Sequence, residues 1–109
     1  MTFTSIEGGA GRVTQGPEAD RMIARCMAAH EQGSDSALFD LGVAFSTGSH
    51  GLNADLVEAH KWFNIAASKG HEEAAWCRAD VSEEMTAREI AEAQRRARQW
   101  LAADCRRAA

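Results

Sequence analysis

The stretch EAHKWFNIAASKG, residues 58–70, decides the fold. At 3.6 residues per turn its apolar residues fall on one side of a helix, whereas His60, Lys61 and Asn64 point elsewhere. The apolar stripe consists of Ala59, Trp62, Phe63, Ala66 and Ala67. Asp55 is a plausible N-cap, and Gly70 stops the helix. We therefore expect a helix with one buried face, whose alanines admit a neighbouring helix and whose aromatic rings fill the space beyond it.

Local signals predict four further helices with short connections. Pro17 suits the first position of a helix, and Gly33 is the left-handed stop at its other end. In the segment TARE, Thr86 and Glu89 form a capping box that opens the last helix. The four predicted ranges are about 17–32, 35–48, 72–85 and from 86 onward.

Composition supports a helical fold. The 109 residues suffice for one small domain, and 45% of them are hydrophobic, with many alanines and few β-branched residues. Residues 1–16 contain four glycines and no apolar period. We therefore expect an all-α domain of about five helices over residues 17–109, preceded by a flexible leader over residues 1–16.

Charge and cysteine usage exclude several classes of protein. A net charge of -4 argues against nucleic-acid binding, although the chain from Thr86 onward carries six arginines against three carboxylates. Those arginines are Arg88, Arg95, Arg96, Arg98, Arg106 and Arg107. Three cysteines without CxxC spacing, no secretory signal and only short apolar runs predict a reducing, cytoplasmic setting and no membrane contact.

The sequence repeats itself at an offset of 37 or 38 positions. Gly33 and Gly70 are related in this way, as are Phe39 and Trp76. The segment AHKWF at 59–63 recurs as ARQWL at 97–101. A fixed period in this range is typical of helical repeat proteins, in which each unit is a pair of antiparallel helices.

The repeated positions resemble the Sel1-like repeat, a relative of the tetratricopeptide repeat. They are Ala37, Leu41, Gly42, Phe45, Gly48, Gly51, Asp55, Ala59, Trp62, Ala66, Ala67, Gly70 and Ala74. The resemblance implies a right-handed α/α superhelix with a degenerate helix at 17–33, a full repeat at 35–70 and a terminal repeat with a capping helix at 71–104. It also implies a bacterial adaptor that binds other proteins.

In such solenoids the first helix of each unit lines the concave face, and this defines our candidate groove. Its residues are Phe39, Asp40, Val43, Glu73, Trp76 and Asp80. The aromatic side chains would anchor a protein or peptide partner, and the acidic surround would favour a basic segment. Two alternatives stay open. Phe39 and Trp76 could instead wedge between repeats, and the chain could self-associate through a solenoid end such as helix 17–33, for example as a homodimer.

An enzymatic function is the remaining alternative. The catalytic motifs SxxK and GxSxG do not occur, but His71 and Cys77 could form the site of a small hydrolase. That reading predicts a closed pocket with a strongly shifted pKa. His50, His60, His71 and Cys77 lack the spacing of a metal site. We expect no catalysis, no metal and no cofactor.

Overall fold

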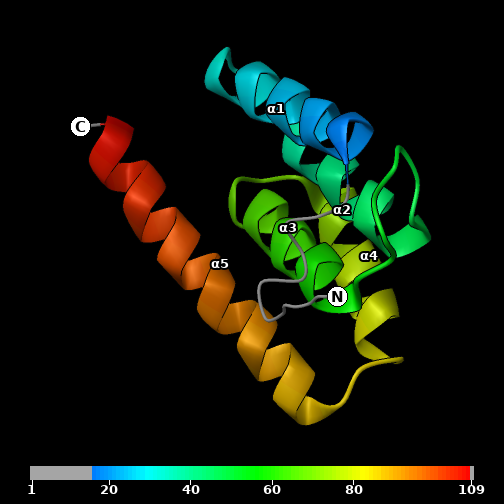
Figure 1. The fold of residues 1–109 in the computed structure, drawn as a ribbon. Coiled ribbons are helices and arrows are strands. Elements are labelled where there is room, and N and C mark those ends of the chain that lie inside the picture. Colours follow the sequence, from blue (N-terminus) through cyan, green and yellow to red (C-terminus); the bar gives the residue numbers. More distant parts are fainter. Residues whose placement is uncertain (1–15, 109) are drawn as a thin grey trace, which may run out of the picture.

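The computed structural model describes residues 16–108, and these form helices without any strand (Figure 1). The helices are α1 (Pro17–Glu31), α2 (Ala37–Thr47), α3 (Leu56–Ser68), α4 (Glu72–Ser82) and α5 (Ala87–Ala108). The predicted all-α class is confirmed for this part of the chain. Of the predicted leader, only Gly16 lies within the described residues.

Helix α3 is the centre of the fold, because α2, α4 and α5 all pack against it while α1 packs on α2 (Figure 1). The largest fully buried side chains are Phe63, Leu41 and Ile65. Four residues of the predicted stripe, Ala59, Trp62, Phe63 and Ala66, are buried as expected, and Ala67 is partly buried. The prediction that His60 points away from the core is wrong, since its side chain is only 2% exposed. With neighbours on several sides, α3 buries more than one stripe.

Helices α2 and α3 approach each other closely at Gly42. A Cβ atom at this position would lie 2.5 Å from two ring carbons of Phe63. Glycine is therefore required here by packing, because its backbone angles are ordinary. The close approach lets the Phe63 ring fill the space between the two helices.

The helix ends follow their predicted caps. The Asp55 carboxylate accepts the backbone N–H of Glu58 at 3.1 Å, and Thr86 and Glu89 form a reciprocal capping box at 3.1 and 2.8 Å. One boundary differs: α4 ends at Ser82, three residues before the prediction. The backbone N–H of Met85 bonds back to the carbonyl of Ser82, which forms a tight turn ahead of α5.

None of the helices formed by residues 16–108 is both long enough and apolar enough to cross a membrane.

Candidate functional site

Helix α4 has one buried side and one exposed side. It buries only Ala74 and Val81. Trp76 lies on the opposite side and is 70% exposed, although tryptophan is usually well buried. At about 100° per residue, five exposed residues share this side within about a third of the circumference. We name them the Trp76 face: Glu72, Glu73, Trp76, Asp80 and Glu83.

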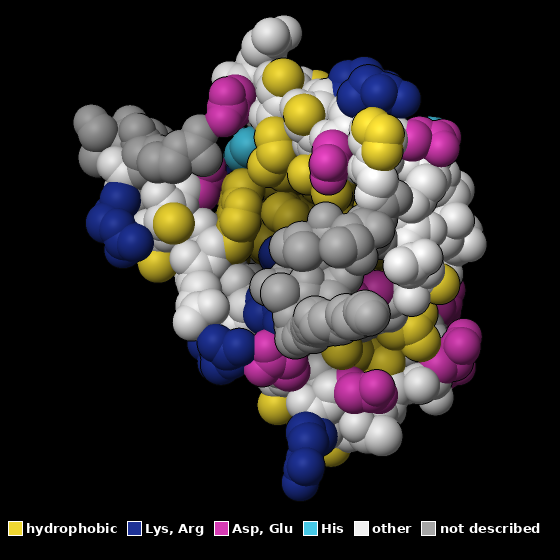
Figure 2. Space-filling model, in the orientation of Figure 1, with side chains coloured by type: hydrophobic (Ala, Val, Ile, Leu, Met, Phe, Trp, Pro, Cys, Tyr) yellow, Lys and Arg dark blue, Asp and Glu magenta, His cyan; other side chains and the backbone are white. Residues whose placement is uncertain are grey.

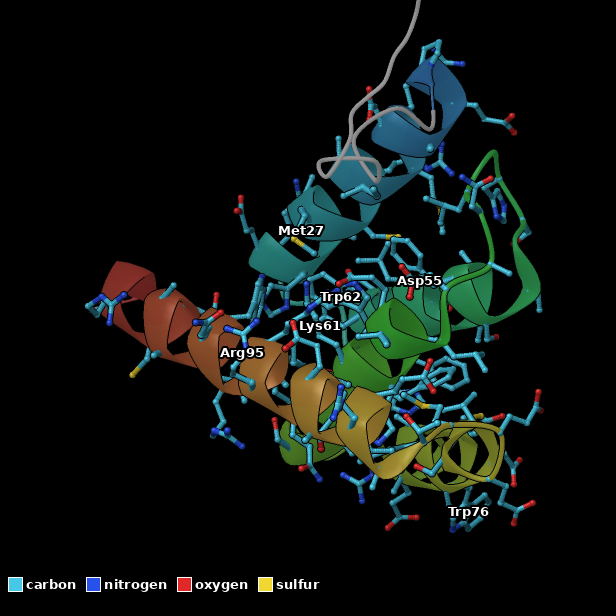
Figure 3. All side chains as sticks on the ribbon, turned by 60° about the horizontal axis from the view of Figure 1, so that its bottom comes forward. Met27, Asp55, Lys61, Trp62, Trp76 and Arg95 are labelled. Atoms are coloured by element: carbon cyan, nitrogen blue, oxygen red, sulfur yellow. The ribbon has the colours of Figure 1, made fainter. Side chains whose placement is uncertain are left out.

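The Trp76 face is acidic and its charges are unpaired. Its four carboxylates make no ion pair with any residue in the range 16–108. The one basic residue of α4, Arg78, lies on another side and donates to the Asn64 side-chain oxygen at 2.6 Å. An exposed indole is thus surrounded by negative charge that nothing in the described structure neutralises. Figure 3 shows Trp76 pointing away from the body of the protein.

The three candidate residues on α2 have different surroundings. Phe39 is half-buried, and its ring stacks on that of His71 with centroids 4.5 Å apart and planes inclined by 14°. It also meets the Phe63 ring at 5.7 Å. Phe39 therefore joins α2 to α3 and to the start of α4, which is the wedge geometry that the sequence left open as an alternative.

A groove of about 500 Å³ lies between α1 and α2. Phe39, Asp40 and Val43 contribute to it from α2, together with Met22, Arg25 and Cys26 from α1. Val43 is 36% exposed and Asp40 is exposed. Glu73, Trp76 and Asp80 do not line this groove.

The six predicted residues are thus distributed over two surfaces: the α1–α2 groove and the Trp76 face. Sequence reasoning missed the α1 side of the groove and two members of the Trp76 face, Glu72 and Glu83. The missing members could have been found from helical spacing, because they lie four positions before and seven positions after Trp76. The α1 contribution depends on how α1 lies across α2, which local spacing does not encode.

The arginines of α5 have two different roles. Arg96 donates to Glu58 of α3 and to Glu92 of its own helix, each at 2.7 Å, and so ties α5 to the core. Arg95 also bonds to Glu92, and the hydrogen bonds from Arg95 and Arg96 lower the pKa of that carboxyl to about 2. Arg88 and Arg106 make no ion pair with the described residues.

Further ion pairs hold the C-terminal half of α5. The Asp104 carboxylate lies 3.3 Å from the Lys69 ammonium and 3.6 Å from the His30 imidazole. The Trp100 ring packs edge-on against Trp62 at a centroid distance of 5.5 Å. The last helix is therefore attached to α3 and α1 on one side, and its other side is exposed. Figure 2 shows Lys and Arg side chains along the outer left edge of α5.

The proposed His71–Cys77 pair has no catalytic geometry. His71 Nδ1 accepts the backbone N–H of Ala74 at 3.1 Å, where it caps α4, and its ring stacks on Phe39. Burial raises the pKa of the Cys77 thiol, and the carboxylates of Glu73 and Asp80 raise it further. This is the opposite of what a nucleophilic cysteine needs, since the thiolate is the reactive form.

Other titratable groups give no alternative centre. Burial raises the pKa of Cys26, with Asp40 raising it further and Arg25 opposing the shift; burial lowers the pKa of His60, and the Arg78 charge lowers it further. Within the described part of the chain, no three His, Cys, Asp or Glu residues are grouped so that they could hold a metal ion. Within residues 16–108, the two surfaces are the features on which a binding proposal can rest.

Comparisons of the chain with protein-family models, with curated proteins and with solved structures gave no match. The likeness to Sel1-like repeats stays a prediction from the sequence.

Proposed function

We propose that the protein is an interaction module that binds a basic segment of a partner protein through the Trp76 face. The observation that carries the proposal is the 70% exposure of Trp76 among four unpaired carboxylates. Tryptophan is prominent among residues that dominate binding energy at protein interfaces, because a large rigid ring loses little conformational entropy when it is covered.

The charges of the face select the partner. A lysine or arginine side chain can place its cation over an indole ring and at the same time pair with a carboxylate, and each contact strengthens where water is excluded. Carboxylates around the ring also attract a basic partner from a distance and repel an acidic one. The carboxylates of Glu72, Glu73 and Asp80 lie around Trp76 within about two helical turns. A partner segment with two or more cations at a spacing of one to two helical turns would therefore fit them.

The architecture that we propose for this module is a short Sel1-like solenoid. Helices α2 and α3 would form the full repeat, and α4 and α5 the terminal one. Two observations support the assignment. Trp62 and Trp100, 38 positions apart, pack against each other from α3 and α5, and Phe39 of α2 contacts the residue that caps α4. A cytoplasmic setting belongs to the same proposal, since Cys26, Cys77 and Cys105 are all free.

Binding of a fluorescein-labelled nona-arginine peptide, followed by fluorescence anisotropy, tests the proposal. We expect Trp76→Ala to weaken binding about tenfold or more, which is a loss of about 1.4 kcal/mol. The matched control is Val43→Ala, which truncates an exposed apolar side chain in the α1–α2 groove. Because Trp76 is mostly exposed, its truncation should change the free energy of unfolding by no more than about 0.5 kcal/mol.

A charge variant separates the indole from the carboxylates. Glu73→Gln combined with Asp80→Gln should weaken binding and flatten its dependence on salt, because fewer ions pair at the contact. Equal affinity of wild type and Trp76→Ala would overturn the proposal. So would a loss of affinity in Val43→Ala alone, which would move the site to the α1–α2 groove.

A further inference from the structure

The outward side of α5 carries a line of exposed arginines and alanines. Arg95 lies seven positions after Arg88, and Arg106 lies eleven positions after Arg95; both offsets are close to whole numbers of helical turns. The exposed alanines Ala91 and Ala102 lie on the same side. We name this set the arginine stripe: Arg88, Ala91, Arg95, Ala102 and Arg106.

The arginine stripe faces away from the core. The buried alanines of α5, Ala93 and Ala97, lie on the opposite side of the helix. Among the described residues, Arg95 pairs only with Glu92 of its own helix, and Arg88 and Arg106 pair with none. The stripe is thus a basic helix surface with two alanines and the exposed Gln99 between its charges, and it has no covering element in this part of the chain.

We propose that the arginine stripe of one copy binds the Trp76 face of a second copy, so that the protein assembles head to tail. The inference rests on the proposed function, because it names the partner of the same face. Charge complementarity carries it: one helix surface has unpaired carboxylates and no cation, and the other has unpaired guanidinium groups.

The Trp76 face matches the C-terminal part of the arginine stripe in length. Glu72 and Glu83 are eleven positions apart on the Trp76 face, and Arg95 and Arg106 are eleven positions apart on the stripe. Eleven residues rise about 16 Å along a helix, so the charges at both ends of one surface can meet those of the other. Between them, the small side chain of Ala102 leaves room for the Trp76 indole to approach the helix.

The two surfaces belong to separate sides of one molecule. Both α4 and α5 pack against α3, and each turns the surface in question away from it. In Figure 3, Trp76 projects from α4 at one end of the view and the labelled Arg95 of α5 lies well apart from it. The pairing therefore joins two copies. Because the two contact surfaces differ, one Trp76 face and one arginine stripe stay free at the ends of the pair. Such a contact continues into chains or closes into rings.

The size of the contact predicts a weak, reversible association. A single helix pair buries less than the about 800 Å² per partner that is typical of stable complexes. Charged contacts at the surface also weaken as salt is added. We therefore expect assembly at high protein concentration and low ionic strength, and dissociation on dilution or in high salt.

The test is sedimentation velocity of the full chain from about 10 μM to about 1 mM, at low and at high salt. The expected result is an average mass that rises past that of a dimer at low salt and returns to the monomer at high salt. Two variants each remove one surface: Trp76→Ala with Asp80→Lys for the face, and Arg88→Glu with Arg106→Glu for the stripe. Arg21→Glu, an exposed arginine on α1, is the matched control and should assemble as wild type does.

Mixing the two variants gives the decisive result. Each variant alone should stay monomeric, but an equimolar mixture should form a one-to-one dimer and nothing larger, because only one intact face and one intact stripe remain to pair. A wild-type mass that stays monomeric throughout would overturn the inference. So would a dimer that persists in both variants, since it would use another surface.

The two proposals fail in different ways. The stripe variant keeps its Trp76 face, so it should bind the nona-arginine peptide as well as wild type does at concentrations where both are monomeric. Constant monomer mass together with Trp76-dependent peptide binding would overturn the head-to-tail contact alone. Absence of Trp76-dependent peptide binding would overturn the proposed function and, with it, this inference.

Discussion

Helices α3 and α4 are neighbours of similar length, yet they use tryptophan in opposite ways. Trp62 on α3 is 5% exposed, and Trp76 on α4 is 70% exposed. Helix α3 has three packing partners and buries six residues, whereas α4 buries two. The residue type therefore does not decide the role. The number of helices around it does: the ring of Trp62 in α3 is buried in the core, and the ring of Trp76 in α4 is exposed.

Truncating each tryptophan in turn tests this comparison most directly and should give the largest effect. Trp62→Ala should lower the free energy of unfolding by about 3–5 kcal/mol, because it leaves a cavity where Trp100 and the core now pack. Trp76→Ala should change it by less than about 0.5 kcal/mol. Urea unfolding followed by far-UV circular dichroism measures both. Similar losses in the two variants would contradict the contrast between the helices.

The second largest effect should come from the contact that sets the distance between α2 and α3. Gly42→Ala improves helix propensity by about 1 kcal/mol but places a methyl group against the Phe63 ring. We expect a net loss of about 1–3 kcal/mol, since the ring or the helix must shift.

A double-mutant cycle checks this explanation. Phe63→Leu removes the ring that the new methyl group would meet, so adding Gly42→Ala to that variant should cost clearly less than it does in the wild type. Equal costs in both backgrounds would show that the close approach at Gly42 is not what restricts the position.

A smaller effect tests whether α5 depends on its capping box. Thr86→Ala removes the side-chain acceptor for the Glu89 backbone N–H and should cost about 1 kcal/mol. Ser36→Ala is the matched control. Ser36 stands at the same position of α2 but makes no side-chain hydrogen bond there, so its replacement should have little effect. Urea unfolding measures the free energy of unfolding of both variants. Equal losses would show that the Thr86 side-chain hydrogen bond does not stabilise α5.

The features that depend on residues close together in the sequence, such as helices and their caps, could be predicted from the sequence. The five helices, the N-cap at Asp55 and the capping box at Thr86 follow from local patterns, and the structure has them all. What depends on how helices meet was not predictable in this way. The burial of His60 and the separation of Phe39 from Trp76 onto two surfaces arise from the positions of α2 and α4 around α3.

The exposure of Trp76 marks the limit of sequence patterns more clearly. Its repeat position matches that of Phe39, which is half-buried between α2, α3 and the start of α4. Within residues 16–108, no ring or helix covers Trp76 as Phe63 and His71 cover Phe39, and Trp76 is 70% exposed. Two aromatic residues 37 positions apart in the sequence therefore differ in exposure because different helices surround them.

The smallest effect at neutral pH concerns His60, the polar side chain buried in α3. Burial lowers its pKa below the ordinary value of 6.5, and the Arg78 charge lowers it further. Near pH 7 and above, the imidazole is mostly neutral in both the folded and the unfolded protein, so its titration contributes little. As the pH falls below about 6.5, the unfolded chain binds a proton more readily than the folded one, and the protein loses stability.

The loss should continue until the pH reaches the lowered pKa of the folded state and should then level off, because both states bind the proton there. Comparing the urea midpoints of wild type and His60→Gln from pH 8 down to about 5 separates the contribution of His60 to the pH dependence of stability from that of the other histidines. The urea midpoint of His60→Gln should fall less than that of wild type as the pH is lowered. If the urea midpoints of the two proteins fall in parallel with pH, His60 binds protons as readily in the folded protein as in the unfolded chain. Helix α3 would then not exclude water at His60, and its contrast with α4 would be contradicted.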